Sequence, residues 1–342
     1  MKTIQVQASK SYNVIIGSGL LACLGERLLS VRNKPCNVAI ISDSSVWPLY
    51  GKTATDSLTA SGFSVVEFQF SAGENSKNAD TYLAILNFLA ENKITRSDLL
   101  IALGGGVVGD MTGFAAATYL RGVDFVQVPT TLLAAVDSSV GGKTALNLPS
   151  GKNQVGAFYQ PKAVLIDPDT LNSLPERQIV NGLMEAIKMG ATSDRSLFEL
   201  FLNDEWKESL DRIIEKALLV KKYVVEQDEK ESSLRRVLNF GHTVGHGIET
   251  AMSLTLLHGE CVALGMIPMC GEKIRPRVIE VLKKCGLYRT LTYDWDKIAE
   301  AAFHDKKADG SSVTVTLVPA IGSFELKTLP CTEVINMAKE CL

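Results

Sequence analysis

The chain has 342 residues, 46% of them apolar and 21% charged, which is long for a single hydrophobic core and favours two adjoining domains. Its formal net charge of −3 makes it a poor candidate for binding nucleic acid, where neutralisation of many phosphates dominates the affinity. The N-terminal residues lack the apolar run of a signal peptide, and no stretch of about 18 apolar residues occurs. The 7 cysteines are scattered without a CxxC pair, as in proteins that keep their thiols reduced. We therefore expect a cytoplasmic protein with neither a membrane nor a nucleic-acid partner.

Short apolar segments alternate with helical patterns along the first half of the chain. The segments are rich in Val, Ile and Phe, and several are continuously apolar, as parallel strands buried on both faces are. Strands and helices in alternation predict an α/β domain with a doubly wound, mostly parallel sheet. The predicted strands cover residues 12–16, 37–42, 64–70, 98–102, 124–128 and 163–166, and the predicted helices include residues 79–91 and 111–120.

The second half of the chain, after Pro175, has long helical periodicities instead. One short β-like segment covers residues 312–318, and the final residues, 332–342, are again helical in pattern. The chain is therefore expected to divide into an α/β domain, residues 1–175, and a mostly α-helical domain, residues 176–342. The other helices predicted in this second domain cover residues 176–190, 196–202, 206–229, 234–251, 259–270 and 277–285.

A glycine-rich turn follows the predicted strand at residues 98–102. Its sequence, residues 104–110, is GGGVVGD, and a helical pattern comes next. Strand, glycines and helix in this order place backbone N–H groups and a helix N-terminus against a phosphate, and glycine permits a close approach and a positive φ. The spacing is neither GxGxxG nor the GxxxxGK[ST] of ATP-binding loops. A pyrophosphate cradle for a dinucleotide and an ordinary tight turn both fit this segment.

Three further groups of small residues follow, at residues 129–131, 137–143 and 151–153, and we interpret them as loops at strand ends. Loops in this position hold ligands in open α/β sheets, although ordinary surface lysines would also account for the two cations. The side chains concerned are Thr130, Thr131, Asp137, Lys143, Lys152 and Asn153.

Three of the 4 histidines lie within 17 residues of sequence. His242 and His246 are four positions apart and share one face of a predicted helix, and His258 lies where the next helix is expected to begin. The glycines of GHTVGHG each cost a helix about 1 kcal/mol relative to alanine, which indicates close packing there. No glutamate follows the first histidine, which argues against an HExxH metalloprotease. Arg235 and Asn239 precede His242 by seven and three residues, so a continuous helix would place all three on one face.

Glu185 is a candidate partner for these histidines. It lies in the apolar helical segment NGLMEAIK, residues 181–188, where a carboxylate must be paired or bound. Two histidines and one carboxylate with an open position form a catalytic zinc site. Hydrogen-bonded core histidines and a Glu185–Lys188 pair at i, i+3 would account for the same residues. The spacing does not decide whether His246 binds metal or acts as an acid or base.

Taken together, these motifs resemble the 3-dehydroquinate synthase family of sugar-phosphate cyclases. They occur in the family's order and cover most of residues 73–307, with the weakest similarity at both ends. Polyol dehydrogenases that share the architecture lack this set of strings. The strings are GGGVVGD, RGVDFVQVPTTLLAAVDSSVGGKTALNLPSGKNQVGAFYQP, NGLMEAIK, LRRVLNFGHTVGHGIE, LLHGE and DKK.

The resemblance implies that residues 1–175 bind NAD and that residues 176–342 bind substrate and a metal ion, zinc or cobalt. Glu185, His242 and His258 correspond to the metal ligands, which leaves His246 as a substrate contact. The implied NAD contacts are Asp43, Gly73, Glu74, Lys77, Gly106, Val107, Val108, Gly109, Asp110, Thr130, Thr131, Asp137, Lys143, Lys152, Thr170, Leu171, Asn172 and Ser173. The implied substrate contacts are Arg121, Lys143, Lys152, Asn153, Lys188, Lys221, Arg235, Asn239, His246 and Lys306, with Lys307 as the alternative to Lys306.

The implied activity converts 3-deoxy-D-arabino-heptulosonate 7-phosphate into 3-dehydroquinate and phosphate, a step of the shikimate pathway of aromatic amino-acid biosynthesis. In this family NAD is reduced and reoxidised within one turnover, phosphate is eliminated, and an intramolecular aldol reaction closes the ring. A substrate with a dianionic phosphate and a carboxylate accounts for the lysines and arginines of the motifs. Arg121 reaches the neighbouring subunit's site in the family, which implies a homodimer.

Three alternatives bear on this reading. Sister cyclases that make deoxyinosose or valiolones tend to differ from 3-dehydroquinate synthases at the positions of Asn239 and His246. Here both positions, and Lys221, have the residues of 3-dehydroquinate synthases. A synthase that makes aminodehydroquinate remains an alternative. A metal-dependent polyol dehydrogenase would release NADH at each turnover and would not need Arg121, Lys152 or Asn153. A catalytically inactive binding module would not need an intact set of metal ligands.

Overall fold

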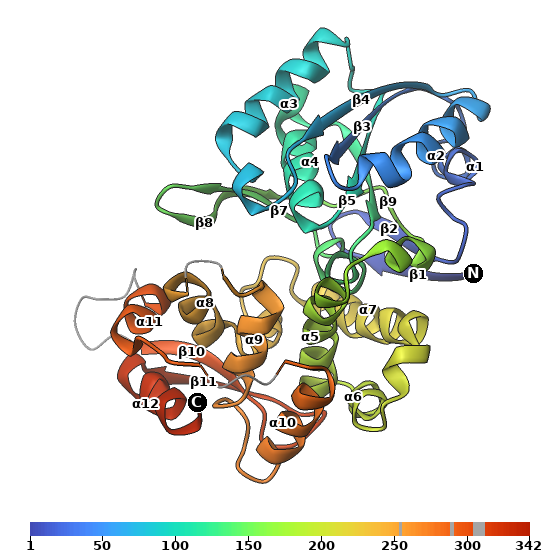
Figure 1. Ribbon diagram of the computed structural model, residues 1–342. Coiled ribbons are helices and arrows are strands. Elements are labelled where there is room, and N and C mark those ends of the chain that lie inside the picture. Colours follow the sequence, from blue (N-terminus) through green and yellow to red (C-terminus); the bar gives the residue numbers. More distant parts are fainter. Residues whose placement is uncertain (253–254, 288–290, 304–311) are drawn as a thin grey trace. The chain divides into compact units, whose positions relative to one another are not determined.

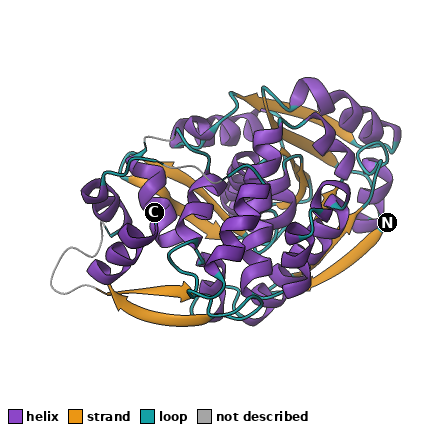
Figure 2. Cartoon of the chain, turned by 60° about the horizontal axis from the view of Figure 1, so that its bottom comes forward, coloured by secondary structure: helices purple, strands orange, loops and turns teal. Residues whose placement is uncertain are grey.

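The computed structural model describes residues 1–252, 255–287, 291–303 and 312–342 (Figure 1). The chain forms two compact units, Met1–Leu174 (unit 1) and Pro175–Leu342 (unit 2). The expected fold class is confirmed, because unit 1 contains a mostly parallel sheet and unit 2 is mostly helical (Figure 2). No helix in the described part of the chain is long and apolar enough to cross a membrane.

Unit 1 is built on a seven-stranded sheet with the strand order β1-β2-β9-β6-β5-β3-β4. β1 and β2 pair antiparallel at one edge, and every other neighbouring pair is parallel. The edge strand β1 was not predicted from the sequence. The strands are β1 (Lys2–Gln7), β2 (Ser11–Ile16), β3 (Asn37–Asp43), β4 (Ser64–Phe70), β5 (Leu99–Gly104), β6 (Asp124–Pro129) and β9 (Ala163–Ile166).

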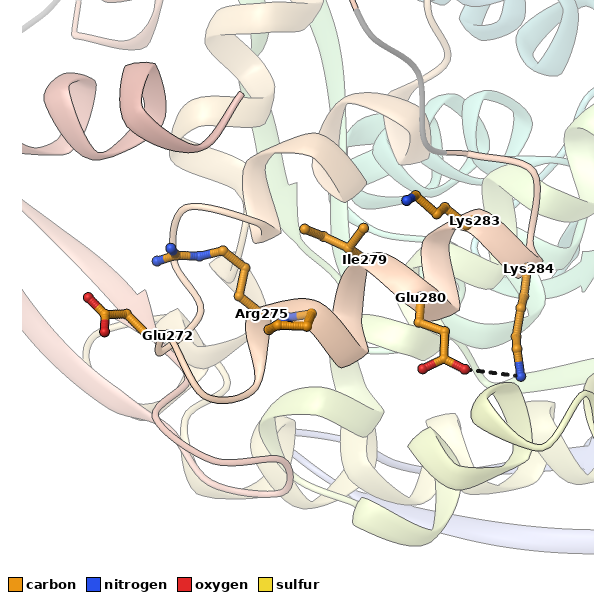
Figure 3. Close-up of a pocket in the computed structure, with 7 residues that line it drawn as sticks. Glu272, Arg275, Ile279, Glu280, Lys283 and Lys284 are labelled. Atoms are coloured by element: carbon orange, nitrogen blue, oxygen red, sulfur yellow. Dashed lines mark ion pairs between the residues drawn. The ribbon is translucent and has the colours of Figure 1, made fainter.

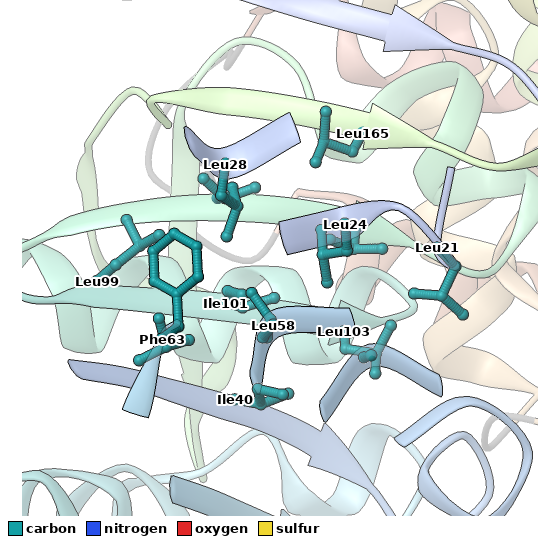
Figure 4. Packing of buried hydrophobic residues seen from close by; sticks show 14 of the residues in the cluster. Leu21, Leu24, Leu28, Ile40, Leu58, Phe63, Leu99, Ile101, Leu103 and Leu165 are labelled. Atoms are coloured by element: carbon teal, nitrogen blue, oxygen red, sulfur yellow. The ribbon is translucent and has the colours of Figure 1, made fainter. Parts of the chain in front are cut away.

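Helices cover both faces of this sheet, which explains why its central strands are continuously apolar. Alternate side chains of a strand point to opposite faces. Ile40 and Ile101 pack with Leu24 and Leu58 of the helices on one face (Figure 4), whereas Ile41 faces the other pair of helices. The helices are α1 (Leu24–Arg32) and α2 (Trp47–Ala60) on the first face, and α3 (Ala79–Glu91) and α4 (Gly106–Thr118) on the second.

The path of the chain creates a topological switch point between β3 and β5. From β3 the chain runs through α2 to β4 on one side, and from β5 it runs through α4 to β6 on the other side. Open α/β sheets bind ligands outside the carboxyl ends of the strands at such a point. Asp43 ends β3 and Gly104 ends β5, so the glycine-rich turn lies where the fold favours a ligand.

The segment that carries Lys143 and Lys152 differs from the predicted loops. It forms an antiparallel hairpin of β7 (Lys143–Leu148) and β8 (Gly151–Phe158), in which both lysines lie on strands. The hairpin is a separate two-stranded sheet, and β7 packs on α4. An antiparallel hairpin therefore presents these cations, where the sequence had predicted loops.

Unit 2 is a set of helices with one small antiparallel sheet. The predicted helix at residues 206–229 is interrupted at Ser209, between a short 3₁₀ helix and α7. The elements are α5 (Glu176–Thr192), α6 (Arg195–Leu202), η5 (Glu205–Glu208), α7 (Leu210–Gln227), η6 (Leu234–Asn239), α8 (His242–Ala251), α9 (His258–Met266), α10 (Arg275–Lys284), α11 (Trp295–Ala302), β10 (Ser312–Leu317), β11 (Glu325–Pro330) and α12 (Cys331–Cys341).

The continuous helix predicted for residues 234–251 is wrong. The chain forms the 3₁₀ helix η6, turns at Gly241 with φ 78°, and then begins α8 at His242. Glycine is required at this turn because a Cβ there would lie 2.6 Å from the backbone oxygen of Val262 in α9. On the opposite helix, a Cβ on Gly265 would lie 2.0 Å from the backbone oxygen of Gly241. The two histidine-bearing helices thus cross in backbone-to-backbone contact.

The central strand β5 gives a first prediction. Ile101 is fully buried in the core between the sheet and α1 and α2, so Ile101→Ala removes apolar contacts and leaves a cavity. We expect the free energy of unfolding to fall by about 2–5 kcal/mol. The matched change Leu83→Ala, on α3 at a side chain 54% exposed, should alter it by no more than about 0.5 kcal/mol. Urea denaturation of both variants measures the difference, and equal effects would contradict the assigned core.

A second prediction concerns Asp98, a buried carboxylate just before β5. It accepts hydrogen bonds from the backbone N–H groups of Asn37 at 3.0 Å and Thr95 at 2.7 Å, and from the Thr95 hydroxyl at 2.7 Å. Burial opposes ionisation, but the hydrogen bonds outweigh it and lower the pKa of Asp98 below its ordinary value.

A carboxylate whose pKa is lowered by folding stabilises the protein above its unfolded pKa, about 3.9, and this stabilisation is lost as the pH falls through the folded pKa. Asp98→Asn should therefore lower the free energy of unfolding at pH 7 by about 1.5–3 kcal/mol, as loss of charged hydrogen bonds does. The gap to the unaltered protein should narrow toward pH 3. Urea titrations across this range test it, and a gap independent of pH would refute the assignment.

Candidate active site

The glycine-rich turn predicted for residues 104–110 is much shorter in the structure: Gly104 ends β5 and α4 begins at Gly106, so Gly105 alone joins them. Gly105 is the N-cap of α4, and a Cβ at this position would lie 2.9 Å from Cγ2 of Thr131. The turn does not need the positive φ that we expected, because φ of Gly105 is −78°. Glycine is needed here for close packing alone.

The first turn of α4 has the features of a dinucleotide phosphate site. The first N–H groups of a helix have no partner within it and point outward with the positive end of the helix dipole. The predicted contacts Gly106, Val107, Val108, Gly109 and Asp110 all lie in this part of α4, at the switch point of the sheet. The hydroxyl of Thr130, directly after β6, is buried and has no hydrogen-bond partner among the described residues. These features fit NAD.

Lys77 joins several of the predicted residues of unit 1. Its ammonium, in a residue only 5% exposed, lies 2.5 Å from Oδ2 of Asp110 and 2.6 Å from Oδ1 of Asn153. Burial raises the pKa of Asp110, although Lys77 acts in the opposite direction. The sequence did not indicate Asn147, whose side chain accepts the N–H of Asn153 at 2.9 Å and donates to Oε1 of Glu74 at 2.7 Å. Glu74, Lys77, Asp110 and Asn153 therefore form one polar network across the hairpin.

The remaining predicted residues of unit 1 lie on four separate segments. Gly73 has φ 108° and precedes η1 (Glu74–Ser76), and Asp137 is in the short π-helix η3 (Ala134–Ser138). Arg121, with φ 65°, ends η2 (Tyr119–Arg121). The turn that contains Thr170, Leu171, Asn172 and Ser173 is η4 (Pro168–Ser173), and the Tyr50 hydroxyl on α2 donates to the Thr170 carbonyl at 2.8 Å.

In unit 2, four predicted residues from three helices converge. Oε1 of Glu185 on α5 lies 3.6 Å from Nε2 of His242 on α8 and 3.6 Å from Nε2 of His258, the first residue of α9. The His246 ring centroid is 5.2 Å from that of His242 and 5.6 Å from that of His258.

Glu185 is the electrostatic centre of this cluster. It is 1% exposed, and neither carboxylate oxygen has a partner with hydrogen-bond geometry among the described residues. Lys188 forms an ion pair with Oε2, so the alternative Glu185–Lys188 pair is also present. Burial alone would raise the pKa of Glu185, but Lys188 and the two histidines outweigh it and hold that pKa well below its ordinary value.

The two histidines next to Glu185 titrate in opposite directions. Burial and the Lys188 ammonium lower the pKa of His242 well below its ordinary value. Burial has the same tendency at His258, but the carboxylates of Glu185 and Glu249 raise its pKa to about 9. The cluster thus contains an ionised carboxylate and a neutral imidazole at His242, whereas His258, with a pKa of about 9, has to release a proton when it binds a metal ion.

The geometry fits a tetrahedral metal ion. Zinc bonds of about 2.0–2.1 Å at tetrahedral angles separate two ligand atoms by about 3.3–3.4 Å, close to the 3.6 Å found on either side of Glu185. Ring nitrogens of His242, His246 and His258 also lie within 4.8 Å of one another, so three histidines form a second possible set. The buried carboxylate without a hydrogen bond favours the set that includes Glu185.

Three of the predicted substrate contacts in unit 2 are buried cations. Lys188, Lys221 and Arg235 are 1%, 5% and 1% exposed. Buried cations need anionic or hydrogen-bonding partners, and a phosphorylated acidic substrate is one such partner.

The segment before η6 is ordered by a residue that the sequence did not indicate. The carboxylate of Asp228 accepts backbone N–H groups of Ser232, Ser233 and Arg235 at 2.7–2.9 Å, and these hydrogen bonds outweigh burial and lower its pKa. Asn239 donates to Oε1 of Glu231 at 2.8 Å.

Two surface depressions of unit 2 contain none of the predicted residues. One of about 570 Å³ lies along the outer side of α10, where Arg275, Ile279 and Lys283 line it (Figure 3). Another of about 560 Å³ lies between α7 and the segment around Phe324. Neither is therefore a candidate for the active site. The predicted substrate contact Lys306 and its alternative Lys307 lie outside the described residues.

Comparison with known proteins places these features in a family. Residues 67–181 match the model described as 3-dehydroquinate synthase N-terminal, and residues 182–308 match the model described as 3-dehydroquinate synthase C-terminal. The 3-dehydroquinate synthase of Streptococcus suis is 42% identical over 343 aligned positions, which cover 95% of this chain and 96% of the relative.

Solved structures of related cyclases have the same fold. A 2-deoxy-scyllo-inosose synthase complexed with carbaglucose-6-phosphate, NAD⁺ and Co²⁺ superposes with a TM-score of 0.89 at 27% identity, and the match covers 100% of both chains. The 2-epi-5-epi-valiolone synthase of Streptomyces hygroscopicus with NAD⁺ and Zn²⁺ bound superposes with a TM-score of 0.88 at 25% identity over 98% of both chains. With both family models matched in sequence along the chain, the chain belongs to the 3-dehydroquinate synthase family.

Proposed function

We propose that this chain converts 3-deoxy-D-arabino-heptulosonate 7-phosphate into 3-dehydroquinate and phosphate, using NAD and a divalent metal ion. The observation that carries the proposal is the convergence of Glu185, His242 and His258, in a chain 42% identical to a 3-dehydroquinate synthase over 95% of its length. The enzyme acts on a small sugar-phosphate and belongs to the shikimate pathway.

In unit 1, the residues around the switch point hold NAD, which supplies a hydride acceptor that is regenerated within the same turnover. The α4 N-terminus faces the pyrophosphate, and the other contacts are those on β3, η1, η3, η4 and the segment after β6. Asp43 and Lys77 are assigned to this set. The network of Lys77, Asp110 and Asn153 keeps the hairpin in a fixed position relative to this binding site.

In unit 2, Glu185, His242 and His258 hold zinc or cobalt, which when bound lowers the pKa of a substrate hydroxyl and polarises the carbonyl formed from it. His246 contacts substrate. Lys188, Lys221 and Arg235 bind its anionic groups, and Asn239 orients a hydroxyl. Arg121, Lys143, Lys152, Asn153 and Lys306 complete the assigned substrate contacts.

A homodimer and a cytoplasmic location belong to the same proposal. Arg121 and the 42%-exposed Leu120 adopt consecutive positive-φ conformations in an exposed turn, as a segment ordered by a second copy would. Sedimentation equilibrium would contradict the dimer if it gave the monomer mass at micromolar concentration. All 7 cysteines are free, as is usual in a reducing compartment.

The reaction itself is tested by following phosphate and NADH together. With the seven-carbon substrate, catalytic NAD and zinc, phosphate should be released without net NADH, and a chelator should abolish the release. Stoichiometric NADH without phosphate would instead identify a dehydrogenase. Release only from the amino-substituted analogue would move the substrate assignment to that variant.

The ligand assignment is tested by paired histidine substitutions on α8. Loss of an outer hydrogen-bond partner of a metal ligand typically lowers metal affinity by about 10–100-fold. His242→Ala should lower zinc affinity by more than this, because it removes a ligand. His246→Ala should retain bound zinc and lose turnover. Equilibrium dialysis with elemental analysis measures the bound metal. Equal loss of zinc from both variants would mean that the three histidines, and not Glu185 with two of them, form the site.

A further inference from the structure

Glu249 contacts the histidine cluster from the third turn of α8. It is seven residues beyond His242, so the two lie on one face of the helix, two turns apart. It is 6% exposed, and its Oε2 lies 3.3 Å from Nδ1 of His258 on α9. A carboxylate on the buried side of a helix thus contacts the ring nitrogen of His258 that does not face Glu185.

The two ring nitrogens of His258 have different partners. Nδ1 faces Glu249, and Nε2 faces Oε1 of Glu185 at 3.6 Å. When Nδ1 carries the proton and donates it to a carboxylate, Nε2 of the neutral ring has its lone pair directed at a metal ion. The contact with Glu249 therefore selects the tautomer that the proposed ligand set requires.

His242 is held in the same way by a different group. Its Nδ1 lies 3.2 Å from the backbone carbonyl oxygen of Phe240, and its Nε2 faces Glu185 at 3.6 Å. A carboxylate accepts a stronger hydrogen bond than a neutral carbonyl does and increases the basicity of the imidazole more. The strength with which His258 donates its lone pair to a metal ion is accordingly controlled by a side chain, that of Glu249.

The backbone on both sides of His258 is fixed separately. The N–H of Gly259 donates to Oδ1 of Asn181 on α5 at 2.7 Å, and the N–H of Leu257 donates to Oε2 of Glu260 at 2.8 Å. Arg177 at the start of α5 binds both oxygens of Glu260 at 2.7–2.8 Å. These contacts place the Cα of His258 relative to Glu185, and rotation of the imidazole is the freedom that they do not restrict.

We propose that Glu249 is a positioning residue that fixes the ring orientation and tautomer of His258 and thereby sets the affinity of the metal site. This inference rests on the proposed ligand set. Glu249 is not one of the proposed metal ligands. Its replacement should therefore weaken metal binding and change the ligand field without removing a ligand.

The test uses the full-length enzyme, stripped of metal by dialysis and titrated with Zn²⁺ against a chromophoric chelator. Glu249→Ala should weaken zinc binding by about 10–100-fold, the usual cost of losing an outer-shell partner of a metal-bound histidine. Glu249→Gln, which keeps the shape and an acceptor oxygen, should lose less. Titration with Co²⁺ should show a changed visible absorption spectrum for Glu249→Ala, because the orientation of one ligand changes.

Two reference variants make the outcome specific. Asp194→Ala removes the N-cap of α6, a carboxylate that accepts the N–H groups of Ser196 and Leu197, and should lower stability without changing zinc affinity. His258→Ala should lose more affinity than either Glu249 variant. Zinc affinities of both Glu249 variants within about twofold of the unaltered enzyme, with His258→Ala impaired, would overturn the role of Glu249 alone. Retention of zinc by His258→Ala would overturn the ligand set itself.

Discussion

The buried carboxylate of Glu185 is the charge around which the centre of unit 2 is arranged. A carboxylate that is 1% exposed costs several kcal/mol unless opposite charges or dipoles surround it. Lys188 approaches from its own helix, and His242 and His258 approach from two others. The packing of α5, α8 and α9 is therefore coupled to the electrostatics of the cluster. The apolar residues beside Glu185 on α5 keep water away, and this keeps the interactions strong.

The ligand site proposed for unit 1 is built differently from the cluster around Glu185. The ligand site proposed there would use backbone groups at the carboxyl ends of β3, β5 and β6, where Gly105 lets β5 and α4 pack closely against Thr131. Among the charged side chains assigned to this site, Lys77 forms an ion pair with Asp110. NAD is suited to such a surface because its pyrophosphate is recognised by N–H groups and its charge is spread over several atoms.

The sequence predicted the parallel sheet because burial on both faces removes alternation from strands such as Leu99–Gly104, which leaves a continuous apolar run. It did not predict the β7–β8 hairpin, since β7 is buried on one face only, β8 has no buried residue, and their glycines and lysines resemble a loop. It likewise extended a helix through residues 234–251, because the spacing of Arg235, Asn239 and His242 continues a helical period. The break at Gly241 depends on the crossing with α9, a contact that no local pattern contains.

The same limit applies within the site. The histidine pair on α8 and the isolated carboxylate on α5 were visible because each conflicts with its local surroundings. Glu249 and Asn147 do not conflict with theirs, and their partners lie on other elements. Residues that orient a ligand are thus harder to recognise from sequence than the ligand itself.

The crossing of α8 and α9 has a consequence for which substitutions this part of unit 2 can tolerate. Gly241 and Gly265 bring the two main chains together with no side chain between them, so the separation of His242 and His258 is set by peptide groups. A side chain at either glycine would push the two main chains apart, because its Cβ would lie 2.0–2.6 Å from a backbone oxygen of the other helix or its turn.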